Sequence, residues 1–172
     1  MNENRDSYNE IAEDWDQVRS SRPIDFCIAE FCSSLSTKAK ILDVGCGTGL
    51  PIGSYLVVKG FHYTGIDISS AMIRKAKSNL PTAKIKCIDF LEFNSEEKFD
   101  ALIAFDSFWH IPYSHQELIL KKAAELLNRD GLILFTYGIN EGSIKGTMFH
   151  SEFSYASLGK KQTDPVYKKE WI

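Results

Sequence analysis

Four aspartates stand at or just after the ends of short apolar runs along the chain. They are Asp43, Asp67, Asp89 and Asp106. In an open α/β sheet, ligands bind beyond the carboxyl ends of the strands, near the point where the strand order reverses. We therefore expect the four carboxylates to converge at one edge of a sheet, around a bound ligand.

A glycine-rich turn follows the first of these aspartates. It spans residues 45–49, with glycine at every second position, and glycine lets a ligand approach the backbone without meeting a Cβ. The helix expected next offers free N–H groups to an anionic group. Asp67 follows Gly47 by 20 residues, the spacing at which an acidic side chain reaches ribose hydroxyls. These features predict a nucleoside ligand that carries an anionic group.

The glycine spacing and Asp43 argue against a dinucleotide. The pattern is Gly-x-Gly-x-Gly rather than Gly-x-Gly-x-x-Gly, and no Gly-Lys-Ser/Thr phosphate loop follows it. Asp43 precedes Gly45 by two residues and would repel a pyrophosphate. It would instead attract an ammonium group or a positive sulfur, because opposite charges interact more strongly in a partly buried site than in water.

Five short apolar runs predict the strands that must position these residues. The runs cover residues 40–44, 61–66, 84–88, 101–105 and 132–136. They lack a strict polar alternation, which is typical of a parallel sheet covered by helices on both faces. Between them, Ser69 is the expected N-cap of one helix, and Ser114 with Glu117 has the capping-box spacing of another. The predicted fold class is a doubly wound α/β fold.

Two helices are expected before the first strand. Tyr8, Ile11, Ala12 and Trp15 share one face of the first, and residues 24–35 form the second. Beyond residue 137, glycines interrupt a stretch rich in serine and aromatic residues. We expect loops there, with one strand at most.

Together these motifs resemble those of the class I S-adenosylmethionine-dependent methyltransferases. The similar segments are Ile41–Gly49, Gly65–Met72, Cys87–Phe90, Phe99–Ile103 with Asp106, Trp109 and His110, and Leu127–Leu132. The resemblance implies a Rossmann-like, mostly parallel sheet with helices on both faces. Members usually complete their sheet with a C-terminal helix and β-hairpin. Only 35 residues follow Tyr137, so we expect part of that hairpin to be missing.

The same comparison predicts the organisation of the chain. We expect a single methyltransferase domain over residues 1–172, with an N-terminal helical lid (1–38), a cofactor-binding core (39–137) and a loop-rich tail (138–172). An uncovered edge of the fifth strand would expose unpaired backbone groups. We therefore expect the tail to fold over this edge, or a second copy to pair with it as a homodimer.

The resemblance implies S-adenosyl-L-methionine as the cofactor and assigns its site. The implied cofactor-binding residues are Tyr8, Trp15, Asp43, Gly45, Cys46, Gly47, Gly49, Asp67, Ile68, Met72, Asp89, Phe90, Phe105 and Asp106. Among these, Asp43 would face the methionine end, Asp67 the ribose hydroxyls and Asp89 the adenine amino group. Tyr8 and Trp15 have an alternative interpretation as core aromatics of an amphipathic helix.

His110 and Tyr113 are the candidate catalytic residues, as bases for an oxygen or nitrogen acceptor. His110 has the alternative role of a structural hydrogen-bonding residue that shapes the pocket. No metal is expected, because residues 138–141 lack the acidic–amide pair of the metal-dependent members.

Composition limits the partners. The formal net charge of −3 over 172 residues provides no general attraction to nucleic acids or anionic membranes. The apolar runs are far shorter than the ~20 residues of a membrane span, and the four cysteines form no metal or disulfide pattern. We expect a cytoplasmic enzyme that methylates a small-molecule O, N or S acceptor. The alternative is an S-adenosylmethionine-binding module without turnover.

Overall fold

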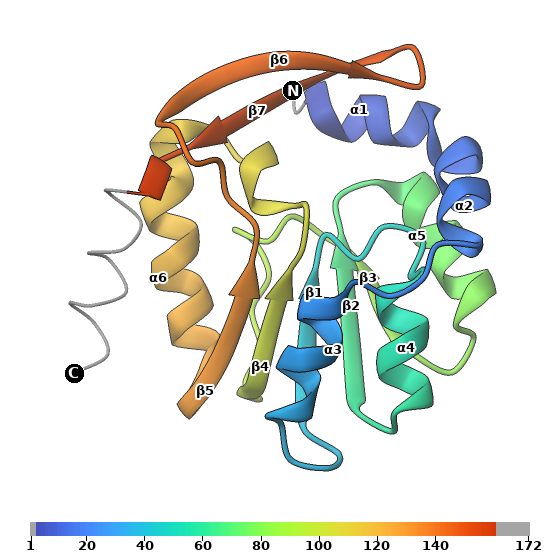
Figure 1. The fold of residues 1–172 in the computed structure, drawn as a ribbon, viewed down its shortest axis with the longest axis vertical. Coiled ribbons are helices and arrows are strands. Elements are labelled where there is room, and N and C mark those ends of the chain that lie inside the picture. Colours follow the sequence, from blue (N-terminus) through green and yellow to red (C-terminus); the bar gives the residue numbers. More distant parts are fainter. Residues whose placement is uncertain (1–2, 161–172) are drawn as a thin grey trace.

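Five parallel strands form the central sheet in the computed structural model, which describes residues 3–160. They are β1 (Lys40–Val44), β2 (His62–Asp67), β3 (Lys84–Cys87), β4 (Phe99–Ala104) and β5 (Leu127–Phe135), in the order β3-β2-β1-β4-β5 (Figure 1). Every neighbouring pair is parallel. The strand order reverses between β1 and β4, which confirms the doubly wound arrangement.

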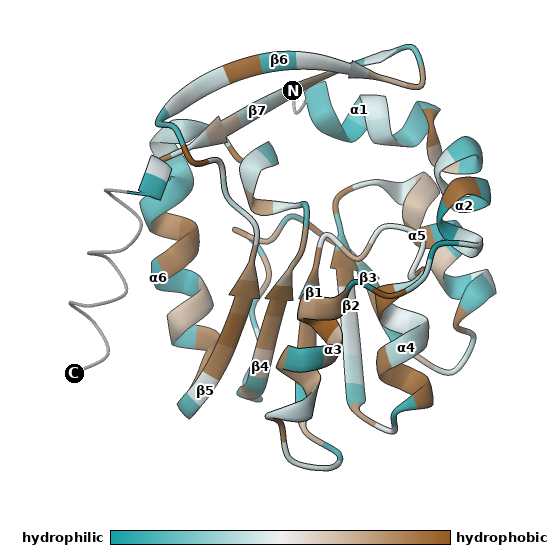
Figure 2. Cartoon of the chain, in the orientation of Figure 1, coloured by the Kyte–Doolittle hydropathy of each residue, from teal (hydrophilic) through white to brown (hydrophobic). Residues whose placement is uncertain are grey.

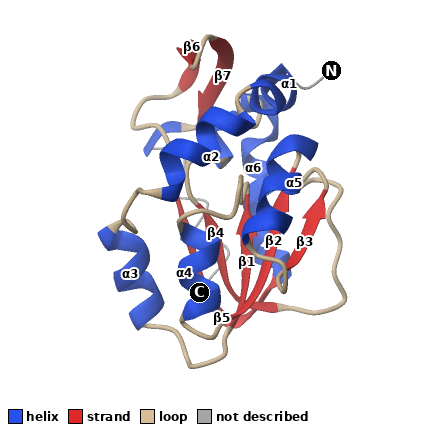
Figure 3. Cartoon of the chain, turned by 90° about the vertical axis from the view of Figure 1, so that its right-hand side faces the viewer, coloured by secondary structure: helices blue, strands red, loops and turns tan. Residues whose placement is uncertain are grey.

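Helices cover both faces of this sheet. The helices α3 (Phe26–Ser33), α4 (Ile52–Val58) and α5 (Ser70–Asn79) pack on one face with strand residues such as Ile41 and Ile103. The helix α6 (Gln116–Leu126) packs on the other face with residues such as Leu42 and Leu102. Figure 2 shows the strands as the apolar centre between these layers, and Figure 3 shows α3 and α4 together on one side. Burial on both faces explains why the strands lack polar alternation.

The two predicted helix starts have different outcomes. Ser69 caps α5 as predicted, because its side chain accepts the N–H of Met72 at 3.1 Å. The capping box at Ser114 is wrong: Ser114 lies in the short 3₁₀ helix η2 (Tyr113–His115), and α6 starts only at Gln116. The amide of Gln116 donates to two carbonyl oxygens of the preceding loop at 2.9 and 2.7 Å, and these buried bonds fix the entry into the helix.

The N-terminal segment forms two helices rather than one. The helix α1 (Glu3–Glu10) ends at a break at Ile11, and α2 (Ala12–Ser20) follows in another direction (Figure 1). Ile11 and Ala12 are buried at this break, in a cluster that also contains Met72 and Phe153. Packing of this apolar pair thus replaces the continuous helix that its spacing predicted.

The tail contains an antiparallel hairpin, so the prediction of loops with at most one strand is wrong for residues 142–157. The strands β6 (Gly142–Met148) and β7 (Ser151–Ser157) pair with each other across a turn at Phe149 and His150, both of which have positive φ. This hairpin is a separate two-stranded sheet that lies across the carboxyl edge of the main sheet, beside α1 (Figure 1). The five-stranded sheet itself gains no strand from it.

The outer edge of β5 is the last strand edge of the main sheet. Within residues 3–160, β5 pairs as a strand only with β4. Homodimerisation through this edge stays a prediction, and residues 161–172 of the predicted tail lie outside the described residues. No helix in the described part of the chain has the length and apolar character needed to cross a bilayer.

Candidate functional site

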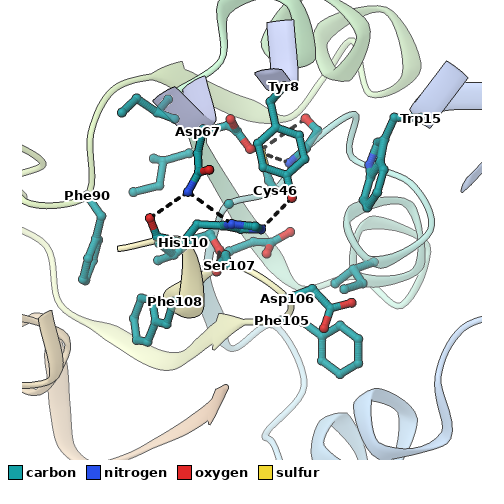
Figure 4. Close-up of a pocket in the computed structure, with 18 of the residues that line it drawn as sticks. Tyr8, Trp15, Cys46, Asp67, Phe90, Phe105, Asp106, Ser107, Phe108 and His110 are labelled. Carbon is teal, nitrogen blue, oxygen red and sulfur yellow. Dashed lines mark hydrogen bonds between the residues drawn. The ribbon is translucent and has the colours of Figure 1, made fainter. Parts of the chain in front are cut away.

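A pocket opens at the carboxyl edge of the sheet, where the strand order reverses (Figure 4). Its floor is the turn after β1 with the ends of β2 and β4, and its roof comes from α1, α2 and the 3₁₀ helix η1 (Phe108–His110). The predicted site residues that line it are Tyr8, Trp15, Asp43, Gly45, Cys46, Gly47, Asp67, Ile68, Asp89, Phe90, Phe105, Asp106 and His110. The four aspartates therefore meet in one pocket, as their positions at strand ends predicted.

Two glycines of the turn, Gly45 and Gly47, line the pocket at positions that do not suit a side chain. Gly45 and Gly47 have φ values of +76° and +54°, a region that L side chains rarely adopt. A Cβ on Gly45 would lie 2.4 Å from the Cβ of Ser107, and one on Gly47 would lie 3.3 Å from the indole nitrogen of Trp15. Glycine therefore keeps the backbone of the turn exposed to the pocket.

The carboxylate of Asp67 accepts two hydrogen bonds from the backbone and can accept further ones. One carboxylate oxygen accepts the N–H of Gly47 at 2.9 Å, and the other accepts the N–H of Ser69 at 2.8 Å. Burial raises the pKa of Asp67, although these bonds act in the opposite direction. Each carboxylate oxygen accepts about two hydrogen bonds. Both oxygens can therefore still receive a hydroxyl group, as a vicinal diol such as that of ribose would require.

Asp43 is a buried carboxyl group on β1. Its side chain accepts the hydroxyl of Tyr63 at 3.0 Å, and burial raises its pKa from 3.8 to about 7. An isolated carboxylate in such a place is costly, and a nearby positive charge would favour its ionised form. The site is therefore suited to a ligand with a cationic group.

Charged and aromatic groups border the opening below α2. A guanidinium nitrogen of Arg19 lies 3.6 Å from a carboxylate oxygen of Asp106, and the same guanidinium lies 4.3 Å from the ring centre of Trp15. Asp106 has a positive φ of 56°, and its N–H donates to the hydroxyl of Thr136 at 2.7 Å. The strained backbone at Asp106 places the Arg19–Asp106 ion pair at the pocket, where it could bind a group that carries both a positive and a negative charge.

An apolar part of the pocket lies beyond the ends of β2 and β3. Ile68, Ile88 and Phe90 line it, and the ring of Phe90 packs against that of Phe108 with centroids 5.5 Å apart. Asp89 is fixed at its edge, since one of its oxygens accepts the N–H of Leu91 at 2.8 Å. An aromatic base would find apolar faces here and a carboxylate for an exocyclic amine.

His110 is held on both sides of its ring. The Nε2 atom lies 2.8 Å from the hydroxyl oxygen of Tyr8, and the Nδ1 atom lies 3.2 Å from the carbonyl oxygen of Ser154. Burial lowers the pKa of His110 from 6.5 to about 4, so the ring is neutral at pH 7. His110 lines the pocket, but neither ring nitrogen is free.

Three predicted site residues lie elsewhere. Met72 is buried in the apolar cluster beneath the hairpin, and a Cβ on Gly49 would meet Leu80 rather than the pocket. Tyr113 lies in η2 and donates its hydroxyl to Glu141 at 2.5 Å. The family motif includes Met72 and Gly49, but here they support α5 and the turn.

Asn4 and Ser107 are among the pocket residues that the sequence analysis did not assign to the site. Asn4 is buried and contacts both η1 and β7, and Ser107 donates its hydroxyl to the carbonyl oxygen of Val44 at 2.6 Å. Asn4 precedes Tyr8 by four residues and so shares its helix face. That spacing was the available signal for Asn4.

Comparisons with known proteins identify methyltransferases as relatives of this chain. Residues 41–131 match the family described as methyltransferase domain. An uncharacterized methyltransferase of Alkaliphilus oremlandii (strain OhILAs) is 29% identical over 143 residues, which are 81% of this chain and 62% of that protein. A ubiquinone biosynthesis O-methyltransferase of Pasteurella multocida (strain Pm70) is 30% identical over 124 residues, 63% of this chain and 50% of that protein.

A solved structure shares the fold over nearly the whole chain. The S-adenosylmethionine-dependent methyltransferase from Clostridium acetobutylicum ATCC 824 superposes with a TM-score of 0.72 at 17% identity, covering 94% of this chain and 86% of that one. The chain spans between half and two thirds of the curated relatives named above. The matched segment contains the glycine turn and all four pocket aspartates. The chain thus belongs to the methyltransferase domain family, as its resemblance to the class I S-adenosylmethionine-dependent methyltransferases predicted.

Proposed function

We propose that this protein binds S-adenosylmethionine in the pocket and transfers its methyl group to an oxygen, nitrogen or sulfur atom of a small molecule. The observation that carries the proposal is the carboxylate of Asp67, which is fixed by the N–H groups of Gly47 and Ser69 and keeps acceptor capacity on both oxygens. When bound, the cofactor supplies an electrophilic methyl group on a positively charged sulfur.

The chain has a suitable group for each part of this cofactor. Asp67 would receive the ribose hydroxyls, and the apolar space at Ile68 and Phe90 would receive the adenine, with Asp89 at its amino group. The methionyl end would lie between Asp43 and the Arg19–Asp106 pair, where its ammonium and carboxylate find opposite charges. The raised pKa of Asp43 supports this assignment, because a positive ligand would favour its ionised form.

The protein's contribution to the reaction is positioning and exclusion of water. The rings of Tyr8 and Trp15, with centroids 5.9 Å apart, close the pocket from the lid side. Holding a nucleophile close to the methyl carbon and in line with the bond that breaks supplies roughly 7–11 kcal/mol of the barrier reduction. The name of the Pasteurella multocida relative supports an oxygen acceptor.

A binding module without turnover is the second candidate. It is favoured by one observation: both ring nitrogens of His110, the predicted base, face partners within the protein. Cofactor binding without methylation of any compound in a broad acceptor screen would support this candidate. Release of S-adenosylhomocysteine with any acceptor would exclude it.

Isothermal titration of S-adenosylmethionine and S-adenosylhomocysteine tests the site. We expect both to bind, and Asp67→Ala to lower both affinities by about 100-fold, since it removes two hydrogen bonds to a charged acceptor. The matched control is Asp14→Ala, which changes an exposed aspartate of α2 and should leave binding intact. If the folded wild-type protein binds neither compound at millimolar concentration, the proposal is wrong.

A further inference from the structure

The roof of the pocket contains a hydrogen-bonded pair, Tyr8 and His110, that joins the lid to η1 (Figure 4). The two residues are far apart in the sequence, but the Tyr8 oxygen and the His110 Nε2 lie 2.8 Å apart. Both side chains line the pocket beside the residues assigned to the cofactor. The direction of this hydrogen bond decides what the Tyr8 hydroxyl offers to a ligand.

Asn4 and Ser154 determine that direction. The side-chain nitrogen of Asn4 has two hydrogens, which reach the carbonyl oxygens of Ser154 at 2.8 Å and of His110 at 3.0 Å. The 3.3 Å contact from this nitrogen to His110 Nδ1 is longer than either bond. Nδ1 therefore carries its own hydrogen and donates it to the carbonyl oxygen of Ser154 at 3.2 Å. Nε2 is left with a lone pair, which accepts the hydroxyl proton of Tyr8.

Tyr8 consequently presents only lone pairs to the pocket. Its proton is committed to His110, so the oxygen can accept a hydrogen bond from a ligand but cannot donate one. Burial raises the pKa of Tyr8 most, and the carboxylates of Asp67 and Asp106 raise it further, so the hydroxyl stays protonated. Asp67 is assigned to the ribose and Asp106 to the methionyl end, and the cofactor's sulfur joins these two parts.

We propose that Tyr8 is a catalytic residue, whose oxygen accepts a hydrogen bond from the O–H or N–H group of the acceptor and turns that atom's lone pair toward the methyl group. This inference rests on the proposed function and narrows its acceptors to hydroxyl and amine compounds. His110 can accept the hydroxyl proton of Tyr8, so the reaction needs no further proton acceptor in the roof.

The proton of a hydroxyl acceptor would pass through Tyr8 to His110. The acceptor's O–H bond breaks, and its proton forms a new O–H bond on Tyr8 while the original hydroxyl proton of Tyr8 moves to His110 Nε2. The positive charge thus passes to the imidazole ring, whose Nδ1–H already faces the carbonyl oxygen of Ser154. A weak base suffices for a hydroxyl acceptor, because a methylated hydroxyl that keeps its proton is a strong acid. For an amine acceptor, Tyr8 only orients the N–H group, and the methylated ammonium product keeps its proton until it leaves the pocket.

Binding of sinefungin tests the orientation of Tyr8 without a known acceptor. In sinefungin, a carbon that bears a primary amine replaces the methylated sulfur, so its N–H groups lie where the methyl group would be. We expect Tyr8→Phe to weaken sinefungin binding about tenfold or more and to leave S-adenosylhomocysteine binding unchanged. The phenylalanine ring keeps the packing against Trp15 and Phe153. Tyr55→Phe, on α4 and outside the pocket, is the matched control and should change neither affinity.

These titrations distinguish a failure of the role assigned to Tyr8 from a failure of the proposed function. An equal loss for both ligands, or no loss for either, would overturn the catalytic role of Tyr8 while leaving the cofactor site intact. If the wild-type protein binds neither ligand, the proposed function fails and this inference fails with it.

Nuclear magnetic resonance of the imidazole nitrogens provides a readout that needs no ligand. We expect His110 to carry its hydrogen on Nδ1 at pH 7 in the wild-type protein, and the Nε2 resonance to move in Tyr8→Phe, where the hydroxyl donor is lost. A hydrogen on Nε2 in the wild-type protein would mean that Tyr8 donates to the pocket, which contradicts the proposal.

Discussion

The buried carboxyl group of Asp43 makes the folded protein less stable when it ionises, although its negative charge suits a cationic ligand. Burial raises its pKa from 3.8 to about 7, even though Tyr63 donates a hydrogen bond to it. The folded protein therefore holds this proton more tightly than the unfolded chain does. The stabilisation from the protonated carboxyl group is complete below pH 3.8 and is lost as the pH rises through about 7.

The substitution Asp43→Asn should remove the loss of stability that the ionisation of Asp43 causes at high pH. An amide cannot ionise, and its oxygen can still accept the Tyr63 hydroxyl. A tenfold change in proton affinity is worth about 1.4 kcal/mol, so at pH 8 we expect the variant's free energy of unfolding to exceed that of the wild type by as much as about 4 kcal/mol. Urea unfolding at pH 4 and pH 8 measures this, and at pH 4 the gain should have nearly disappeared.

The same variant should bind S-adenosylmethionine more weakly, because it lacks the negative charge assigned to the cationic end of the cofactor. Asp14→Asn, at an exposed position of α2, should change neither stability nor affinity. A variant that is less stable than the wild type at both pH values would show that Asp43 supports the fold rather than the ligand.

At this scale the aspartates were predictable, and the family resemblance also indicated Tyr8, Trp15 and His110 of the roof, but the contacts within the roof were not predictable. Asp43, Asp67, Asp89 and Asp106 follow strand ends, and chain topology alone brings strand ends together. The contact between Tyr8 and His110 joins a lid helix to a loop after β4, and no local spacing encodes it. The position of Asn4 depends in turn on a hairpin that the sequence did not reveal.

Among the elements, the hairpin and α1 hold each other in place over the sheet. The side chain of Asn4 works like a neighbouring strand, since its oxygen accepts the N–H of Ser154 and its nitrogen donates to the Ser154 carbonyl oxygen, both at 2.8 Å. Phe153 is fully buried beneath this contact, against Ile11 and Met72. The roof of the pocket therefore forms only when both elements are present.

We expect Asn4→Ala to lower the free energy of unfolding by about 1–3 kcal/mol, because it leaves the part-buried N–H of Ser154 without its acceptor, while the Ser154 carbonyl oxygen keeps only His110 as a donor. Hydrogen exchange should also accelerate at the amide of Ser154. The matched control is Ser7→Ala on the same helix, which removes the exposed hydrogen bonds of this hydroxyl to the carbonyl oxygens of Glu152 and Glu3. Equal effects of the two substitutions would contradict this account of Asn4.

The elements were predicted well where burial dictates their pattern. All five strands of the main sheet and the cap at Ser69 follow from apolar runs and local hydrogen bonding. The hairpin was missed because its turn places Phe149 and His150 at positive φ, where Asn-Gly is the usual signal. The break at Ile11 was missed because tertiary packing, not propensity, ends α1 there.

The whole molecule consists of a rigid sheet layer and a roof that closes one edge of it. Two apolar clusters lie on the two faces of the sheet, and a third lies between α1, α2, α5 and the hairpin. The pocket separates the sheet edge from this third cluster. A ligand that contacts Asp67 below and Tyr8 above would therefore bind both layers at once, and its binding energy would stabilise the roof as well as the sheet.

S-adenosylhomocysteine at 100 times its Kd should raise the free energy of unfolding by about 2.7 kcal/mol, which corresponds to roughly 5–10 °C in Tm for a domain of this size. Hydrogen exchange should slow in α1, α2 and the hairpin more than in α3, which lies away from the pocket, because the ligand reduces opening of the roof. In Asp67→Ala, both effects should disappear at the same concentration. Protection confined to the turn after β1, with no change in α1 or the hairpin, would mean that the roof closes independently of the ligand and has no part in holding it.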